Sequence, residues 1–421
     1  MNSKGNNVDW PLMTPMRQDF DVTTVPDLES ELSMQIRARL AKSRVVEGGS
    51  VAVGVGSRGV SPIRRVVSTI VSELKLAGLK PFIVPAMGSH GGSTAAGQQD
   101  VLEQYGISEE TVGCEVRATM ETDILGQTPQ GVQIHGDANA YSADHVVIVA
   151  RVKPHTDFKA DIESGLCKML SIGLGKRNGA ETIHAAGLAE TIPEAATVAL
   201  GTGRILFGVA LVENALDLPA IVRVAADHEF HSTDRELLVT AKRILPRLPA
   251  DSLDFLVVDE MGKNISGAGM DTNIVGTWRL HASSERQPDY RYLAALRLTR
   301  ESNGNASGIG MADFTTRALV DAIDFEASNI NAITSLVTTA VRVPITFETD
   351  EICLETGVSV ANRLSPSGPR IGRIKNTMEL ETFWVTEPVA IELERAGLAS
   401  ADGGPQPFEF DAEGHLTDLS S

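Results

Sequence analysis

The first half of the chain alternates short apolar runs with stretches of helical periodicity. Residues 50–56 form an apolar run that ends in glycine, and residues 62–76 then repeat their apolar side chains at helical spacing. Residues 81–87 are a second apolar run, followed by a second helical pattern at 95–105. Strands that alternate with helices pair in parallel, because each helix carries the chain back across the sheet. The sequence therefore predicts an α/β fold with a mainly parallel sheet.

The alternation continues to the end of the chain and divides near residue 248. Residues 144–152 read as a buried central strand. Pro246 and Pro249 follow a predicted helix at 232–245, and prolines in this position end helices and mark linkers. A chain of 421 residues is also too long for one ordinary core. We predict an N-terminal α/β domain at 1–248 and a C-terminal α/β domain at 249–421 that closes an active-site cleft.

The remaining predicted elements fit this division. They are strands at 205–213, 220–226, 253–259, 290–298 and 373–377, and helices at 314–323 and 327–340.

Charge and composition exclude several classes of partner. The formal net charge is −18, whereas nucleic-acid binding needs a basic face. The three cysteines form no paired motif, which argues against a disulfide framework. The N-terminus lacks a signal pattern, and no apolar run is long enough to span a membrane. We expect a soluble cytoplasmic protein whose anionic substrate would need local cations, available as Arg58, Lys153, Lys159, Lys168, Lys176 and Arg177.

Two glycine-rich segments resemble nucleotide-binding loops. Residues 54–59 fit G-x-G-x-x-G between a strand and a helix, the context of dinucleotide binding. The acidic residue that would hold a ribose hydroxyl at the end of the next strand is missing, since residues 84–87 are Val-Pro-Ala-Met. An NAD-dependent dehydrogenase remains an alternative on this loop. Residues 173–177 lack the first glycine and the final Ser/Thr of a phosphate loop, which excludes ATP binding of that type.

Three of the nine histidines lie in glycine-rich segments of the first half. His90 follows the predicted strand 81–87, and His155 follows the strand 144–152, so both should lie at carboxyl ends of strands, where open α/β sheets bind ligands. His184 follows a segment, 164–179, whose glycine density predicts close backbone approach to a ligand. Imidazole suits proton transfer near neutral pH. The spacing of the three is not that of a compact zinc motif.

Lys168 lies between apolar residues and admits two interpretations. A partly buried lysine is usually paired, here with Asp161 or Glu163, and this is the favoured interpretation. The alternative is an amine nucleophile that attaches a cofactor covalently.

These residues together resemble the lactate racemase family, whose enzymes carry a nickel-pincer nucleotide. The resemblance covers most of the chain and is most specific at Gly88-Ser89-His90, at Pro154-His155, and at Ser164-Gly165-Leu166-Cys167-Lys168 with the later His184. It implies that Lys168 is joined to the pincer ring through a thioamide and that His184 ligates nickel. It also implies that His90 and His155 are the acid and base that flank the substrate.

The resemblance extends to the neighbouring loops, with departures. It implies that Arg58 grips the substrate carboxylate, and that Ser57, Asp271 and Asn273 bind the cofactor. The family's aspartate before these residues is Val55 here, and Gly91 replaces a larger polar residue of the lactate enzymes.

The activity implied is racemisation or epimerisation at C2 of a small anionic 2-hydroxy acid by hydride transfer to the nickel-pincer nucleotide. The departures favour an acid other than lactate, either a larger acid or a sugar acid. Enzymes that synthesise the cofactor would be transient partners. A binding protein that holds an anion without cofactor is a further alternative.

Overall fold

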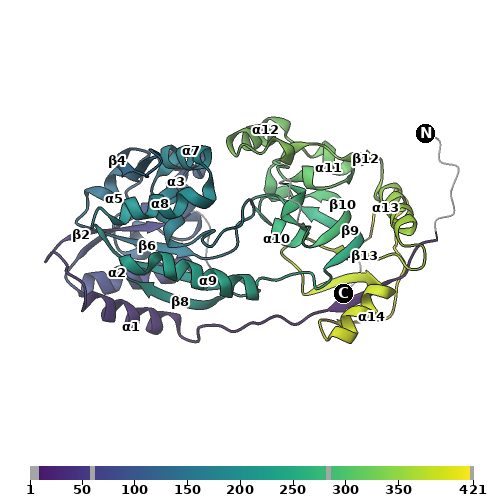
Figure 1. Ribbon diagram of the computed structural model, residues 1–421, viewed down its shortest axis with the longest axis horizontal. Helices are drawn as coiled ribbons and strands as arrows, with labels where there is room; N and C mark the ends of the chain where they lie inside the picture. Colours follow the sequence, from purple (N-terminus) through teal and green to yellow (C-terminus); the bar gives the residue numbers. More distant parts are fainter. Residues whose placement is uncertain (1–8, 57–61, 281–285, 418–421) are drawn as a thin grey trace. The chain divides into compact units, whose positions relative to one another are not determined.

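The computed structural model describes residues 9–56, 62–280 and 286–417. The chain divides into two compact units, Asp21–Leu245 and Met1–Phe20 with Pro246–Ser421. The predicted N-terminal domain at 1–248 also includes residues 9–20. These residues belong to the other unit because β1 (Met13–Arg17) pairs with β14 (Thr382–Thr386) near the end of the chain, as the purple and yellow strands in Figure 1 show.

The N-terminal unit is built on a five-stranded sheet with the order β3-β2-β6-β7-β8. The first four strands are parallel and β8 is antiparallel to β7. The strands are β2 (Ser50–Val55), β3 (Lys80–Pro85), β6 (His145–Arg151), β7 (Ile205–Glu213) and β8 (Pro219–Ala225). A separate hairpin joins β4 (Thr122–Gln127) to β5 (Gln133–Asp137).

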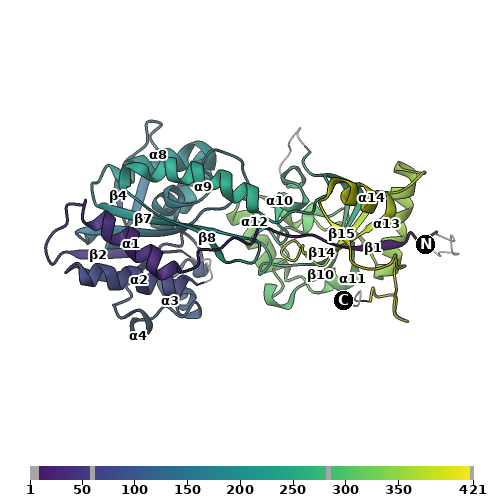
Figure 2. The same ribbon diagram turned by 90° about the horizontal axis from the view of Figure 1, so that it is seen from below.

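Both faces of this sheet are covered, which is why its strands are apolar throughout. In β6, Val146 and Ile148 enter one hydrophobic core, and Val147 and Val149 enter the other. Successive side chains of a strand point to opposite faces, so each face needs its own helices. Figure 2 shows α1 (Leu28–Leu40), α2 (Ile63–Leu76) and α3 (Ala95–Gln104) on one side, and α8 (Leu188–Leu200) and α9 (Phe230–Ile244) on the other.

The glycine-dense segment 164–179 is largely helical, although glycine is unfavourable inside helices. It contains α6 (Leu166–Lys168), a π-helical turn η2 (Met169–Gly173) and the start of α7 (Lys176–Ala186). Its glycines allow packing within the protein: a Cβ on Gly173 would lie 2.8 Å from the carbonyl oxygen of Ala86. The contact seats the turn after Lys168 against the end of β3.

The remaining helices of this unit are short: α4 (Glu109–Val112), α5 (Ala138–Ser142), η1 (Gly91–Ser93) and η3 (Asp227–Glu229).

The C-terminal unit contains an eight-stranded sheet with the order β12-β11-β10-β9-β13-β14-β1-β15. The pairs from β12 to β13 are parallel, and those from β13 to β15 are antiparallel. The strands not yet given are β9 (Ser252–Met261), β10 (Asp289–Leu298), β11 (Phe314–Thr316), β12 (Ile345–Phe347), β13 (Ile371–Ile374) and β15 (Ser400–Ala401). Both units therefore confirm the predicted α/β class with mainly parallel sheets.

The predicted helix at 314–323 is instead a strand and a short helix, β11 and α11 (Arg317–Asp321). The hydroxyl of Thr316 donates to the carbonyl of Leu296 and accepts from the N–H of Leu319, so this one side chain ends the strand and begins the helix. The other helices are α10 (Thr272–Val275), α12 (Phe325–Thr334), α13 (Asp350–Leu364), α14 (Glu387–Ala396), η4 (Thr277–Arg279), η5 (Arg300–Ser302), η6 (Ile309–Met311) and η7 (Thr338–Val341). Within the described ranges, no helix has the length and apolarity that a membrane crossing requires.

Candidate active site

Two predicted site residues of the N-terminal unit, His90 and His155, follow strands that end at the same edge of its sheet. Strands β2, β3 and β6 run parallel, so the loops that follow them leave from one edge. His90 follows β3 and His155 follows β6. Ser57 and Arg58 follow β2 but lie outside the described residues.

The loop that carries His155 is closed by the two residues before Gly165. The hydroxyl of Ser164 accepts from the N–H of Lys153 at 2.7 Å and donates to its carbonyl oxygen at 2.6 Å. The fully buried carboxylate of Glu163 accepts from the N–H groups of His155 and Ala160 at 2.8 and 3.1 Å. These contacts fix the backbone of the loop and therefore the place from which the imidazole projects.

His155 contacts Lys168, the residue expected to hold the cofactor. The Nε2 atom of His155 lies 2.6 Å from Nζ of Lys168, and the N–H of Asp157 donates to Nδ1 at 3.0 Å. The ring of Phe158 packs on the imidazole with the two centroids 4.6 Å apart. The imidazole side chain is 14% exposed, so the pair is largely shielded from water but still open at one side.

The favoured interpretation of Lys168 is a salt bridge to Asp161 or Glu163, and it stays a prediction. The carboxylate of Glu163 pairs with Lys242 of α9 at 2.7 Å, and Nζ of Lys159 lies 4.0 Å from it. The amine of Lys168 contacts the imidazole of His155.

Asp234 of α9 caps the short helix on which Lys168 lies. Its fully buried carboxylate accepts from the N–H groups of Leu166 and Cys167 at 2.9 and 2.8 Å. Gly165 has φ +95°, and a Cβ there would lie 2.2 Å from Asp234 Oδ1, so only glycine fits. Burial raises the pKa of Asp234 from 3.8 to about 7, against the lowering effect of the two N–H bonds.

This raised pKa predicts a pH-dependent stability. Because the folded state keeps the Asp234 proton to a higher pH than the unfolded chain, the group's contribution to the free energy of unfolding falls as pH rises from about 4 to about 7 and is constant above. The difference in unfolding free energy between wild type and Asp234→Asn, measured by urea denaturation, should fall by as much as about 4 kcal/mol over that range. An Asp234→Asn difference that does not change with pH would contradict the prediction.

Gln98, a buried side chain of α3, holds the loop that carries His90. The amide of Gln98 donates to the carbonyl oxygens of Gly88 and His90 at 2.8 and 3.2 Å, and the N–H of Gly88 donates to the carbonyl of Gly173 at 3.0 Å. The His90 side chain itself is exposed. Gly91 has φ +64°, and a Cβ there would lie 2.6 Å from the backbone of Gly97. Packing therefore explains Gly91, and its small size carries no information about substrate size.

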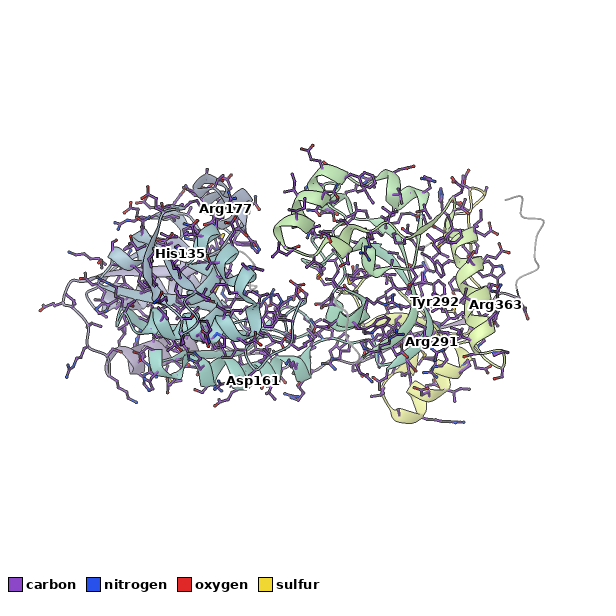
Figure 3. All side chains as sticks on the ribbon, turned by 45° about the horizontal axis from the view of Figure 1, so that its top comes forward. His135, Asp161, Arg177, Arg291, Tyr292 and Arg363 are labelled. Carbon is purple, nitrogen blue, oxygen red and sulfur yellow. The ribbon has the colours of Figure 1, made fainter. Side chains whose placement is uncertain are left out.

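Lys176 connects this loop to the helix of His184. It is fully buried, has φ +54°, and donates from Nζ to the carbonyl of Pro85 and to Oε1 of Gln98. Nζ also lies 2.9 Å from Oδ2 of Asp137, which is fully buried as well. Burial lowers the pKa of Lys176 and raises the pKa of Asp137, while their mutual attraction opposes both shifts. The next residue, Arg177, points to the surface (Figure 3).

One hydrogen bond of His184 decides which of its ring nitrogens could bind a metal. Its Nδ1 lies 2.6 Å from the carbonyl oxygen of Ala180, one turn earlier in α7, and therefore carries the proton. In a neutral imidazole this leaves the lone pair on Nε2, the arrangement that metal-ligating histidines usually have. Among the described residues no three His, Cys, Asp or Glu side chains form a metal cluster. A cofactor that itself coordinates the metal would need only one further ligand from the protein, and Nε2 of His184 could be that ligand.

Asp271 and Asn273 lie in the C-terminal unit. The Oδ1 atom of Asp271 accepts from both the N–H and the side-chain amide of Asn273, at 2.8 and 2.9 Å, and so begins α10. Their proposed contact with a cofactor stays a prediction.

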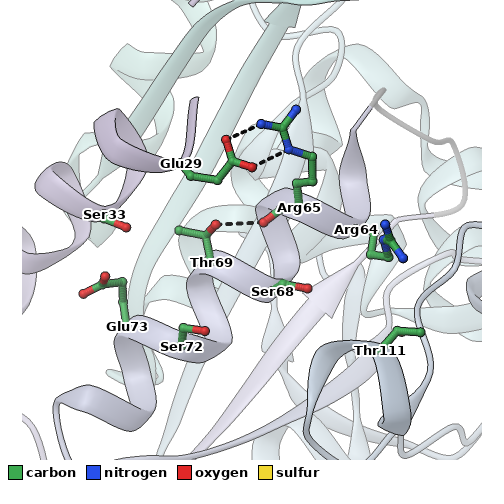
Figure 4. A pocket seen from close by; sticks show the side chains of 9 residues that line it. All are labelled: Glu29, Ser33, Arg64, Arg65, Ser68, Thr69, Ser72, Glu73 and Thr111. Carbon is green, nitrogen blue, oxygen red and sulfur yellow. Dashed lines mark hydrogen bonds and ion pairs between the residues drawn. The ribbon is translucent and has the colours of Figure 1, made fainter. Parts of the chain in front are cut away.

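A pocket of about 400 Å³ lies elsewhere on the N-terminal unit, and no predicted site residue lines it (Figure 4). It is lined by hydroxyl and charged side chains, namely Glu29, Ser33, Arg64, Arg65, Ser68, Thr69, Ser72, Glu73 and Thr111.

Several fully buried polar side chains hold the site together, and the sequence analysis did not single out Gln98, Asp137 or Asp234. It named Lys176 as a cation for the substrate and Glu163 as a partner of Lys168, but Lys176 is buried against Asp137 and Glu163 pairs with Lys242. Buried polar side chains are recognised by their surroundings, and those come from segments distant in sequence.

Comparisons with known proteins agree with this architecture. Residues 31–195 match the family of the lactate racemase N-terminal domain. Among solved structures, the chain is similar to a lactate racemase apoprotein from Thermoanaerobacterium thermosaccharolyticum, with a TM-score of 0.50, 13% identity, and coverage of 87% of this chain and 93% of that one. A protein from Thermotoga maritima gives a TM-score of 0.52 at 13% identity, with coverage of 76% and 84%. No curated protein sequence matches the chain.

Proposed function

We propose that this chain, whose residues 31–195 belong to the lactate racemase N-terminal domain family, is an isomerase that inverts C2 of a 2-hydroxy acid. The observation that carries the proposal is the contact of His155 with Lys168, at the sheet edge from which the His90 loop also leaves. The family match supports the racemase role, and the particular acid and the roles of the histidines are our proposal.

The side chains present fit a nickel-pincer nucleotide. Lys168 offers an amine for covalent attachment, and His184 offers the lone pair of Nε2 to the metal while Nδ1 is held by Ala180. Imidazole is a suitable ligand for nickel. When bound, the cofactor would supply the acceptor and donor of a hydride, so that C2 passes through a planar 2-keto acid.

The residues of this chain would then move protons at the substrate hydroxyl. A proton on C2 is too weakly acidic for histidine, but a hydroxyl proton that leaves together with a hydride is not. His155 would exchange that proton from one face and His90 from the other. Their different anchoring, on β6 and on β3, suits two opposed positions around one substrate.

Stereochemistry at C2 tests the function. Protein produced together with the cofactor-synthesis enzymes should convert single enantiomers or epimers of some 2-hydroxy acid in a panel that includes lactate and sugar acids. His90→Asn and His155→Asn should each lower kcat/KM by roughly 10²–10⁴-fold, the usual contribution of an acid or base. Absence of turnover with every acid, in protein shown by mass to carry the cofactor, would overturn the proposal. Micromolar binding of NAD would favour the dehydrogenase alternative.

A further inference from the structure

The loop that carries His90 has a backbone rich in left-handed conformations. Four of its residues have φ between +56° and +64°, namely Gly88, Gly91, Gly92 and Ser93. Glycine adopts such angles without steric cost, but it also adopts many others, so a loop of this composition loses much conformational entropy when it is fixed. A single position for the His90 side chain therefore requires contacts from outside the loop.

The side chain of Gln98 supplies such contacts. Its amide donates to the carbonyl oxygens of Gly88 and His90 at 2.8 and 3.2 Å, and a side-chain amide has two N–H donors, so both are used. Its Oε1 atom accepts from Nζ of Lys176 at 3.1 Å. Gln98 is fully buried, so water does not replace these bonds.

Lys176 fixes the orientation of that amide. An ammonium group has three donors and no lone pair. Among the described residues, three oxygen atoms lie around Nζ: the carbonyl of Pro85, Oε1 of Gln98, and Oδ2 of Asp137 at 2.9 Å. If the Gln98 amide were turned over, its NH₂ group would face the ammonium and its oxygen would face two carbonyl oxygens. Each contact would then join two donors or two acceptors, so Lys176 selects the orientation that holds the loop.

The same ammonium joins the His90 loop to the helix of His184. Lys176 is the first residue of α7, which carries His184. The N–H of Gly88 donates to the carbonyl of Gly173, in the turn before α7, at 3.0 Å. The backbone and the buried side chains thus connect the two histidine-bearing segments independently.

We propose that Gln98 and Lys176 are positioning residues for His90, and that Lys176 acts on the loop through Gln98. Gln98 holds the two carbonyl groups of the loop, and Lys176 keeps the amide turned toward them. All of these contacts lie within the protein, so they hold the loop with or without a cofactor. The inference rests on the proposed function only for the role of His90 as an acid or base.

Hydrogen exchange of the cofactor-free protein tests the positioning without any activity. Four amides of the loop donate to backbone carbonyls, those of Gly88, His90, Ser93 and Thr94. Gln98→Met keeps a similar volume but removes both donors, so these amides should exchange about tenfold faster, while those of β7 keep the wild-type rate. Gln99→Met changes the exposed neighbour, whose amide donates to Glu103, and should leave the loop unchanged.

A second set of variants tests the route through Gln98. Lys176→Met is combined with Asp137→Asn, so that no buried carboxylate is left without its cation. This pair should also make the loop exchange about tenfold faster, while β7 exchanges slowly because the unit stays folded. Adding Gln98→Met to the pair should change loop exchange by less than about twofold, since both changes remove the same contact.

Several results would overturn the inference. One is loop exchange at the wild-type rate in Gln98→Met, and another is equal acceleration of the loop and β7 in that variant. Effects of Gln98→Met and of the Lys176 pair that multiply would overturn the route through Gln98.

Kinetics of the cofactor-loaded enzyme separate positioning from a general structural role. Gln98→Met should lower kcat by about 10–100-fold, the usual result of a misplaced catalytic group, and leave KM near the wild-type value. In a His90→Asn background the same change should lower kcat by less than about twofold, because His90 no longer acts. A full effect in that background would contradict the positioning of His90. Failure to invert any 2-hydroxy acid, with the exchange results intact, would overturn only the proposed function.

Discussion

Replacing Lys176 by methionine should lower the free energy of unfolding of the N-terminal unit by about 3–5 kcal/mol. Methionine fills a similar volume but leaves the carboxylate of Asp137 buried without its cation, and Gln98 Oε1 and the carbonyl of Pro85 lose a donor. The thermal midpoint of this unit should fall by roughly 10 °C. Because burial already raises the pKa of Asp137, the variant carboxylate should take up a proton, and the loss should grow as pH increases.

Two further variants separate the effect of losing the ion pair from nonspecific destabilisation. Arg177→Met removes the neighbouring exposed cation, whose solvent-screened pair with Glu181 should contribute little, so the free energy of unfolding should stay at the wild-type value within measurement error. Lys176→Met combined with Asp137→Asn removes the unpaired charge while the remaining Oδ1 still accepts from Ala140, and should recover at least half of the loss. A single-variant cost below about 1 kcal/mol, or a double variant no more stable than the single one, would contradict the assignment.

Replacing Lys168 by alanine should abolish covalent attachment. Intact mass spectrometry of protein produced with the cofactor-synthesis enzymes should show an adduct on the wild type and none on Lys168→Ala, with a loss of racemase activity to background. The exposed control Lys159→Ala should keep the adduct. An adduct of unchanged mass on Lys168→Ala would place the attachment elsewhere.

Replacing His184 by alanine should separate the metal from the tether. The adduct mass of the organic part should persist, because Lys168 is intact, while nickel per chain measured by elemental analysis should drop by about tenfold or more. Nickel retained at the wild-type ratio would exclude His184 as the ligand.

Much of the fold could be read from periodicity. The apolar runs at 50–56 and 205–213 became β2 and β7, because a strand buried on both faces must be apolar along its whole length. Residues 314–323 could not be read in this way. Their helical spacing is real, but pairing of β11 with β10 and β12 outweighs the local preference of three residues.

The sequence by itself determined the α/β class and the positions of His90 and His155 after strands, since hydrophobic period and chain order are local properties. Only the tertiary structure decided that Lys168 contacts His155. It also decided that Asp234 holds the helix of Lys168 and that Glu163 holds the loop of His155. The same is true of the buried network formed by Gln98, Asp137 and Lys176. The physical reason is that a buried polar side chain is stable only with partners, and folding brings those partners from segments far apart in the chain.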